Sequence, residues 1–198
     1  RDNAAAFTLD KMHAMVDRDE RQIQSLIRLI EDMLDVSRIR TGKLSIRPAR
    51  FDLAQLVRNL VKNFAPQVAS AGSSMHLVAD EPVEGNWDEF RIEQVVTNLL
   101  TNALRYGAKS PVDVRVYTEH GEARVEVRDR GIGISADNQK RIFQQFERVS
   151  ASHVAAGLGL GLFISEQIVT AHGGTIEVES QIGEGALFRV CLPLGEPQ

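Results

Sequence analysis

The 198-residue sequence lacks three features that would set its class at once. It has one cysteine, Cys191, so no internal disulfide can brace the fold. No apolar run reaches membrane-spanning length, and no signal peptide precedes the first predicted helix. Lys and Arg number 23 against 27 Asp and Glu, and the formal net charge of −4 argues against nonspecific nucleic-acid binding. We therefore expect no nucleic-acid partner and no membrane contact by this segment.

What is present is typical of a soluble globular protein. Hydrophobic residues make up 43% and charged residues 25%, which suits one core plus an appendage rather than two full domains. Cys191 lies in an alternating strand pattern and is expected to be a buried structural thiol. The chain begins with Arg1 rather than Met, which favours a piece of a longer protein.

The strongest local pattern is a predicted helix over 91–107. Its apolar residues recur at steps of three and four and form one face. They are Ile92, Val95, Val96, Leu99, Leu100, Ala103 and Leu104. Asp88 is expected as the N-cap and Gly107 as the C′ residue that ends the helix.

The other face of this helix carries a polar stripe. Gln94, Asn98, Asn102 and Arg105 follow one another at steps of four, four and three. Asn is a poor helix former, and two in register cost on the order of 1 kcal/mol of helix propensity. Carboxamide oxygens can ligate Mg²⁺ and an Arg can bind phosphate oxygens, so the stripe is a candidate ligand site. An ordinary solvated face is the alternative that spacing alone leaves open.

Two glycine-rich segments follow. Asp129-Arg130-Gly131-Ile132-Gly133-Ile134 comes after an alternating run, and Gly157-Leu158-Gly159-Leu160-Gly161-Leu162 opens a helical pattern. The free N–H groups at the start of that helix favour anions. A dinucleotide-binding fold is disfavoured, because no strand precedes the second segment. Taken alone, Asp129 also fits a plain turn, and the second segment also fits a mobile loop without a ligand.

In this order, the motifs resemble the nucleotide-binding domain of sensor histidine kinases, whose superfamily also holds gyrase, heat-shock and mismatch-repair ATPases. The segment 142–148 is similar to the family's phenylalanine box, and His172-Gly173-Gly174 and Gly183-Glu184-Gly185 continue the match. Upstream, the segment 34–39 resembles the end of the family's second dimerisation helix. The resemblance covers nearly the whole chain. It implies a bacterial, cytoplasmic location, with any membrane anchor elsewhere in the parent protein.

The patterns and the resemblance predict an α+β fold, a two-layer α/β sandwich of the gyrase and histidine kinase type. Its sheet is mixed and mostly antiparallel, with helices on one face. We expect a partial helical dimerisation domain at 1–42 and an ATP-binding catalytic domain at 43–198. The expected elements are helix 8–40, strand 43–51, a helix from the capping box of Asp52 and Gln55 to Ser70, strand 75–79, the Asn-bearing helix, strands 112–118 and 123–129, a helix capped by Ser135 that contains 141–146, helix 159–172, and strands 174–180 and 186–192.

The predicted helix 8–40 carries a heptad-like seam. Val16, Ile23, Ile27, Ile30 and Leu34 alternate steps of three, four and seven. Further apolar residues widen the stripe beyond a two-stranded coil, which suits a helix bundle. The helix could instead pack on its own domain, but the seam is longer than that domain could easily cover. We therefore expect a homodimer through this helix in the full protein.

The resemblance implies an ATP site between the Asn-bearing helix and the second glycine segment, which would act as a lid. Asp129 is implied to select adenine. Asn102 is the implied Mg²⁺ ligand, and Asn98, Arg105 and Arg148 are the implied catalytic residues. The residues implied to bind ATP are Asn98, Asn102, Arg105, Tyr106, Asp129, Gly131, Gly133, Ile134, Phe146, Gly157, Leu158, Gly159, Leu160, Gly161 and Leu162.

Other aromatic and histidine positions have simpler expected roles. Phe143 and Phe146 are expected to be core anchors, and His172, before two glycines, is expected to cap a helix. The remaining histidines have no partner motif and are expected at the surface or at an edge: His13, His76, His120 and His153. None has the sequence context of the family's phosphoacceptor.

The sequence therefore predicts the ATP-binding catalytic part of a histidine kinase, which uses ATP and Mg²⁺ and relays phosphate to a response regulator receiver domain. The acceptor histidine is expected upstream of Arg1 or on another protein, so this fragment alone should not autophosphorylate. A related ATPase is one alternative, but those enzymes place a Glu where this chain has Asn98, and an amide cannot take a proton from water. A nucleotide-sensing scaffold without phosphotransfer is an alternative from a different class.

Overall fold

The computed structural model describes residues 9–107, 109–147 and 158–195. Five of its strands are β2 Met75–Val78, β4 Val112–Glu119, β5 Glu122–Arg128, β6 Thr175–Gln181 and β7 Gly185–Pro193. They form one sheet in the order β2-β4-β5-β7-β6. The β2–β4 pair is parallel and the other three pairs are antiparallel, so the expected mixed, mostly antiparallel sheet is confirmed.

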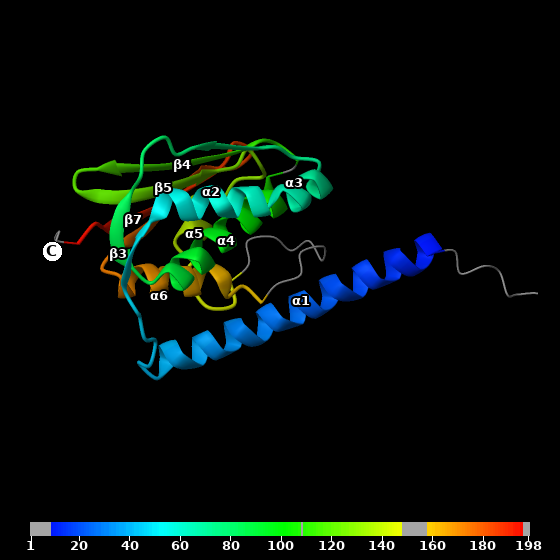
Figure 1. The fold of residues 1–198 in the computed structure, drawn as a ribbon, viewed down its shortest axis with the longest axis horizontal. Helices are drawn as coiled ribbons and strands as arrows, with labels where there is room; N and C mark the ends of the chain where they lie inside the picture. Colours follow the sequence, from blue (N-terminus) through cyan, green and yellow to red (C-terminus); the bar gives the residue numbers. More distant parts are fainter. Residues whose placement is uncertain (1–8, 108, 148–157, 196–198) are drawn as a thin grey trace, which may run out of the picture.

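Helices form the second layer. They are α1 Leu9–Arg40, α2 Leu53–Asn63, α3 Ala65–Ala71, α4 Glu89–Tyr106, the short α5 Ala136–Gln139, and α6 Gly161–Ala171. Figure 1 shows α2, α4 and α6 on one face of the sheet, with α1 running across the outer side of this helical layer. Together they give the predicted two-layer α+β arrangement plus a helical appendage.

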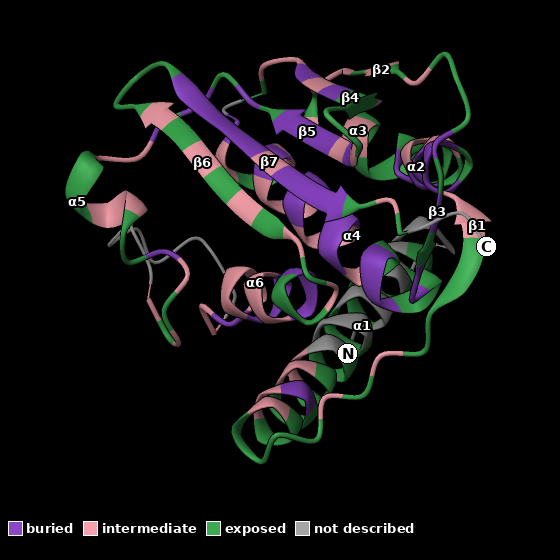
Figure 2. Cartoon of the chain, turned by 90° about the vertical axis from the view of Figure 1, so that its left-hand side faces the viewer, coloured by how far each residue is buried: buried purple, intermediate pink, exposed green. Residues whose placement is uncertain are grey.

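The hydrophobic core lies between the sheet and α2, α4 and α6. Along β7, Ala186, Phe188, Val190 and Leu192 alternate and are all buried. Because successive side chains of a strand point to opposite faces, these four share one face of the sheet. Figure 2 shows β7 buried along most of its length, between β5 and β6. Cys191 is buried on this strand as expected, and burial raises the pKa of its thiol.

Helix α4 begins and ends where the sequence predicts, by a partly different mechanism. Asp88 is the N-cap, and its carboxylate accepts a hydrogen bond from the backbone N–H of Arg91 at 3.2 Å. Gly107 ends the helix as predicted, but it is the C-cap, and its φ of −73° is not left-handed. A side chain at Gly107 would instead collide with the carbonyl oxygen of Ala103. Close packing, rather than a positive φ, accounts for this glycine.

The strand predicted at 43–51 is mostly wrong. Only β1, Ala49–Asp52, is a strand, and it pairs antiparallel with β3, Glu84–Trp87, in a separate two-stranded sheet. The backbone N–H of Arg47 donates to the Asp88 carboxylate at 2.8 Å, and Pro48 has no N–H to donate. The segment before Ala49 therefore lacks the donors that a strand ladder needs.

The helix predicted from Asp52 to Ser70 is broken in two. Asp52 caps α2 through the backbone N–H of Ala54 at 2.9 Å. The Gln55 side-chain oxygen accepts hydrogen bonds from Arg58 at 3.2 and 3.1 Å instead of from the backbone of Asp52, so the expected capping box is wrong. The break falls at Phe64, between α2 and α3, because Pro66 lies in the first turn of α3 and cannot continue the hydrogen bonding of α2.

The helix expected to contain 141–146 is also wrong. Ser135 caps α5, but the helix ends at Gln139 and turns follow through Phe146. Phe146 has φ +65°, outside the helical region, and its backbone N–H donates to the carbonyl of Gly159 at 3.1 Å. Its side chain is 62% exposed, so its expected role as a core anchor is wrong. Phe143 does pack against the core.

His172 confirms the predicted cap at the end of α6. Its Nδ1 lies 2.8 Å from the carbonyl oxygen of Ile168, and its Nε2 accepts the backbone N–H of Asp88 at 3.0 Å. The ring therefore donates from Nδ1 and accepts at Nε2. The hydrogen bond between Asp88 and His172 connects the end of α6 to the start of α4.

Helix α1 presents two different sides. The seam residues Ile23, Ile27, Ile30 and Leu34 are 43–59% exposed. Val36 and Ile39 instead pack against the hydrophobic core. Within the described residues, no helix is long and apolar enough to cross a membrane.

Candidate functional site

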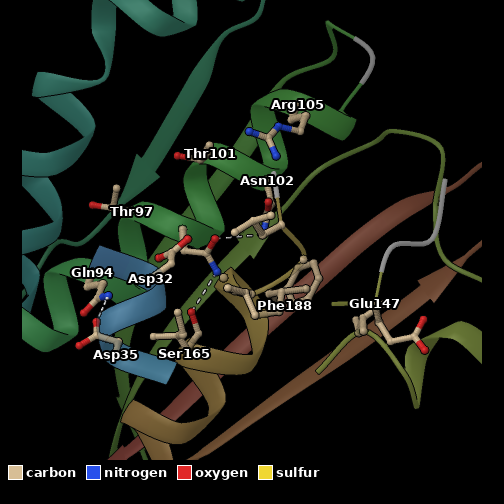
Figure 3. Close-up of a pocket in the computed structure, with 18 of the residues that line it drawn as sticks. Asp32, Asp35, Gln94, Thr97, Thr101, Asn102, Arg105, Glu147, Ser165 and Phe188 are labelled. Carbon is tan, nitrogen blue, oxygen red and sulfur yellow. Dashed lines mark hydrogen bonds between the residues drawn. The ribbon is translucent and has the colours of Figure 1, made fainter. Parts of the chain in front are cut away.

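A cavity of about 940 Å³ lies between α1, α4, α6 and the segment after β5 (Figure 3). All four residues of the polar stripe on α4 line it: Gln94, Asn98, Asn102 and Arg105. The predicted ligand-binding residues Tyr106, Asp129, Gly133, Ile134, Leu158, Gly159, Leu160, Gly161 and Leu162 also line it. Gly131 and Phe146 do not line it, and Arg148 and Gly157 lie outside the described residues.

One wall of the cavity comes from α1, which the sequence interpretation assigned to self-association. Leu29, Asp32, Asp35 and Arg38 are among its lining residues. Figure 3 shows Asp32 and Asp35 on the same side of the cavity, near α4. A signal was available in the sequence, because acidic residues interrupt the apolar stripe of α1 on the side away from the seam.

A buried polar cluster fixes α1 to α4. Asp35 Oδ2 accepts hydrogen bonds from Arg91 Nη1 and from Gln94 Nε2, each at 2.8 Å. Arg91 Nη1 also donates to Gln94 Oε1 at 2.8 Å. Asp35 and Arg91 are both buried, so the charges compensate each other away from water. Gln94 is therefore engaged in this junction.

The two asparagines are joined to α6 through a buried serine. Asn98 Nδ2 donates to Ser165 Oγ at 3.0 Å, and Asn102 Nδ2 lies 3.5 Å from Asn98 Oδ1. Figure 3 shows these contacts as a line from Ser165 to Asn102. Ser165 was not among the residues that the sequence pointed to. The available signal was a hydroxyl among the apolar positions Ile164, Ile168 and Val169 of α6.

Asp129 supplies a buried carboxylate to the cavity. Its Oδ1 accepts the backbone N–H of Gly131 at 2.9 Å. Burial raises the pKa of Asp129, and hydrogen bonds from the backbone of Gly131 and Ala186 oppose that shift in part. A hydrogen-bond donor from a ligand would compensate the desolvated carboxylate, which suits recognition of an amine.

The glycines of the two motifs serve close contacts within the chain. A side chain at Gly131 would collide with the carbonyl oxygen of Tyr106 at the end of α4. A side chain at Gly161 would collide with Asn98 Oδ1. The glycines therefore let the two segments approach α4 closely.

Residues 87–196 match the family described as "Histidine kinase-, DNA gyrase B-, and HSP90-like ATPase". This match covers more than half of the chain and includes α4, both glycine segments and the whole of β7. The chain belongs to this family. As a histidine kinase-, gyrase B- and HSP90-like ATPase domain, it is an ATP-binding unit, and its cavity lies within the matched region and against α1. The predicted boundary between residues 42 and 43 stays a prediction.

Relatives of this ATPase domain include full-length sensor proteins. The sensor protein GacS of Pseudomonas syringae pv. syringae is 33% identical over 186 residues, covering 88% of this chain and 20% of that protein. The sensor histidine kinase RcsC of Escherichia coli strain K12 is 33% identical over 173 residues, covering 85% of this chain and 18% of that protein. The chain thus spans about a fifth of the length of these relatives.

Solved structures agree on the fold of the domain. Full-length ShkA in complex with AMPPNP superimposes with a TM-score of 0.79 at 25% identity, covering 98% of this chain and 41% of that one. The histidine kinase AdeS of Acinetobacter baumannii gives a TM-score of 0.73 at 22% identity, covering 98% and 89%. The predicted fold class is confirmed.

Proposed function

We propose that the chain is the ATP-binding catalytic part of a sensor histidine kinase. It transfers the γ-phosphoryl group of ATP to a histidine outside this chain, for relay to a response regulator receiver domain. The observation that carries the proposal is the cavity wall of Asn98, Asn102 and Arg105 in a chain whose relatives are sensor kinases. An amide at Asn98 cannot take a proton from water, which disfavours the hydrolysis of the related ATPases.

ATP fits the groups that line the cavity. The buried Asp129 carboxylate can accept a hydrogen bond from the exocyclic amine of adenine. Arg105 can bind phosphate oxygens, and the first turn of α6 has no side-chain cap on its N–H groups. These groups line a single cavity, which supports a nucleotide as the ligand.

Mg²⁺ fits the same site through Asn102. In the described part of the chain, no group of three or more His, Cys, Asp or Glu side chains could hold a metal by itself. Mg²⁺ bound with nucleotides often takes one or two protein ligands, with phosphates and waters completing its shell. A single carboxamide oxygen from Asn102 suits that pattern. When bound, the ion would neutralise charge on the phosphates.

The protein residues act mainly by positioning. Asn98 and Arg105 orient the γ-phosphoryl group, and Arg148 is proposed to join them from the lid. No histidine among the described residues lines the cavity, and both ring nitrogens of His172 are engaged. The phosphoacceptor therefore belongs to another segment or another protein.

The proposal is tested on the full-length parent protein with γ-labelled ATP and Mg²⁺. We expect label on the protein in an acid-labile, base-stable form, as for phosphohistidine, and none on the 198-residue chain alone. ATP hydrolysis without a phosphoprotein would favour the ATPase alternative. Nucleotide binding without either reaction would favour the sensing scaffold.

Asp129→Asn should reduce the preference for adenine over guanine nucleotides. The substitution replaces an acceptor-only group by one that also donates, and the loss of a hydrogen bond to a charged group corresponds to about a 10-fold weaker ADP affinity. Calorimetry with ADP and GDP measures it. Asp137→Asn, an exposed position on α5, is the control. An unchanged ADP affinity, or equal parental affinities for ADP and GDP, contradicts the assignment.

The same variant should alter the pH dependence of stability. Because burial raises the pKa of Asp129, the folded chain holds more protons than the unfolded chain above the ordinary Asp pKa. Stability contributed by this group is therefore lost as the pH rises through the raised pKa. Asp129→Asn removes that loss, so its ligand-free Tm at neutral pH should equal or exceed the parental value.

The exposed seam of α1 should drive self-association. Exposing its apolar side chains to water costs several kcal/mol, at about 25 cal/mol per Å² of apolar surface. The side chains are Ile23, Ile27, Ile30 and Leu34. Light scattering of the full chain should show a concentration-dependent dimer, which Ile23→Asp with Ile30→Asp disrupts. Arg18→Asp, exposed and off the seam, should leave it intact. A monomer at high concentration speaks against this interface.

A further inference from the structure

We propose that Ser165 is a positioning residue, which sets the amide orientation of the metal ligand Asn102 by holding Asn98. The inference rests on the proposed function of the cavity and concerns a side chain on α6 that lines it behind the asparagines. Ser165 is 2% exposed, and its hydroxyl oxygen accepts a hydrogen bond from Asn98 Nδ2 at 3.0 Å. A buried hydroxyl in that position has a defined partner and little freedom to choose another.

Gly161 and Ser165 together form the contact surface of α6 for the Asn98 carboxamide. They are four residues apart on α6, so they lie on one side of the helix. Gly161 provides room for Asn98 Oδ1, where a side chain would collide, and Ser165 holds Asn98 Nδ2. The two ends of one carboxamide therefore meet two different groups of the same helix.

These two contacts determine which side-chain atom of Asn102, Oδ1 or Nδ2, faces a ligand. With Nδ2 committed to Ser165, Asn98 offers its Oδ1 toward Asn102, which must face it with Nδ2. That contact is 3.5 Å, a length that ligand binding can shorten. The Asn102 Oδ1 has no hydrogen bond within the described part of the chain, so it remains as the acceptor for a hard cation.

The opposite orientation of Asn98 is less favourable. A flipped carboxamide would set its NH₂ group against the NH₂ group of Asn102. The Ser165 hydroxyl could donate to the flipped oxygen, but the clash of donors would remain. Removing the hydroxyl takes away the hydrogen bond that anchors the Asn98 carboxamide to α6. Asn102 would then lose its fixed orientation as well.

The test measures AMPPNP affinity of the full chain by calorimetry, with Mg²⁺ and with EDTA. The ratio of the two affinities reports the metal-dependent part of binding. Ser165→Ala should lower this ratio about 10-fold, as for loss of a group that orients a metal ligand, and leave the EDTA affinity unchanged. Ser165→Thr and Ser165→Val are a matched pair of similar shape. Threonine should retain the ratio and valine should lose it.

Val169→Ala controls for a purely structural effect. Val169 is buried one turn further along α6, and the substitution should lower Tm without changing the ratio. A second readout needs no ligand: in ¹⁵N spectra, Ser165→Ala should shift and broaden the side-chain amide signals of both Asn98 and Asn102. Three results would overturn this inference without affecting the proposed function. They are unchanged signals from Asn102, an unchanged affinity ratio in Ser165→Ala, and equal losses of the ratio in the threonine and valine variants. A parent chain that binds no AMPPNP would instead overturn the proposed function.

Discussion

Asn102→Ala should weaken Mg²⁺-dependent nucleotide binding about 100-fold, because it removes the proposed protein ligand of the ion outright, a larger loss than that of an orienting group. The fold should survive, since Asn102 lies on the cavity side of α4 and, among the residues that the structure describes, its amide makes one long hydrogen bond, to Asn98. The core face of the helix, including Leu99 and Leu100, stays in place.

The experiment compares AMPPNP affinities with Mg²⁺ and with EDTA for the parent and the variant. Thr101→Ala is a matched control, because Thr101 precedes Asn102 on α4 and also lines the cavity (Figure 3). We expect the control to keep the metal dependence. If Asn102→Ala binds the Mg²⁺ complex as tightly as the parent, the metal role of this residue is wrong.

A second substitution, Asn98→Glu, tests whether the protein acts as a kinase or as an ATPase. The carboxylate could accept hydrogen bonds from both Ser165 and Asn102, so the local packing can accommodate its polarity. Near phosphates it repels negative charge unless it takes a proton from water. In the full-length parent it should reduce phosphotransfer to histidine while slow ATP hydrolysis rises. A parent that already hydrolyses ATP as fast as dedicated ATPases contradicts the kinase assignment.

The stripe on α4 was predictable because helical geometry alone fixes which residues share a face. Asn98, Asn102 and Arg105 all line the cavity, as their spacing implied. The wall from α1 was not predictable in this way. Asp35 and Arg91 are 56 residues apart, and their contact depends on how the helices pack. Ser165 was missed for the same reason, since its partner Asn98 lies on another helix.

The errors in the fold also have local physical causes. Alternation predicted a strand at 43–51, but Pro48 and the bond from Arg47 to Asp88 redirect the backbone. Helical periodicity carried one predicted helix past Pro66, and it carried another past Gln139, where α5 ends. In each case a periodic side-chain pattern gave the wrong answer because backbone hydrogen bonding decided the structure.

Arg91→Ala should release α1 from the catalytic part of the chain. The substitution leaves the buried Asp35 carboxylate with Gln94 and with Arg38, which is 3.4 Å away. Removing one partner of a buried ion pair typically costs about 3–5 kcal/mol. Lifting α1 off exposes Asp35 to water without unfolding the core, so the cost should appear as undocking of α1. The cap of α4 should persist, because Asp88 bonds to the backbone of residue 91.

Hydrogen exchange measured along the full chain distinguishes undocking from unfolding. Amides in the last turns of α1 should exchange much faster in Arg91→Ala, while those of β5 and β7 keep their parental rates. The matched control is the double variant Asp35→Leu with Arg91→Met, in which an apolar pair replaces the ion pair and docking should return, since such replacements are often neutral or stabilising. Parental exchange of α1 in Arg91→Ala would show that apolar contacts such as those of Val36 and Ile39 suffice to hold the helix. Because α1 forms one wall of the cavity, restored docking in the double variant would also show that shape and burial at this junction matter more than its charges.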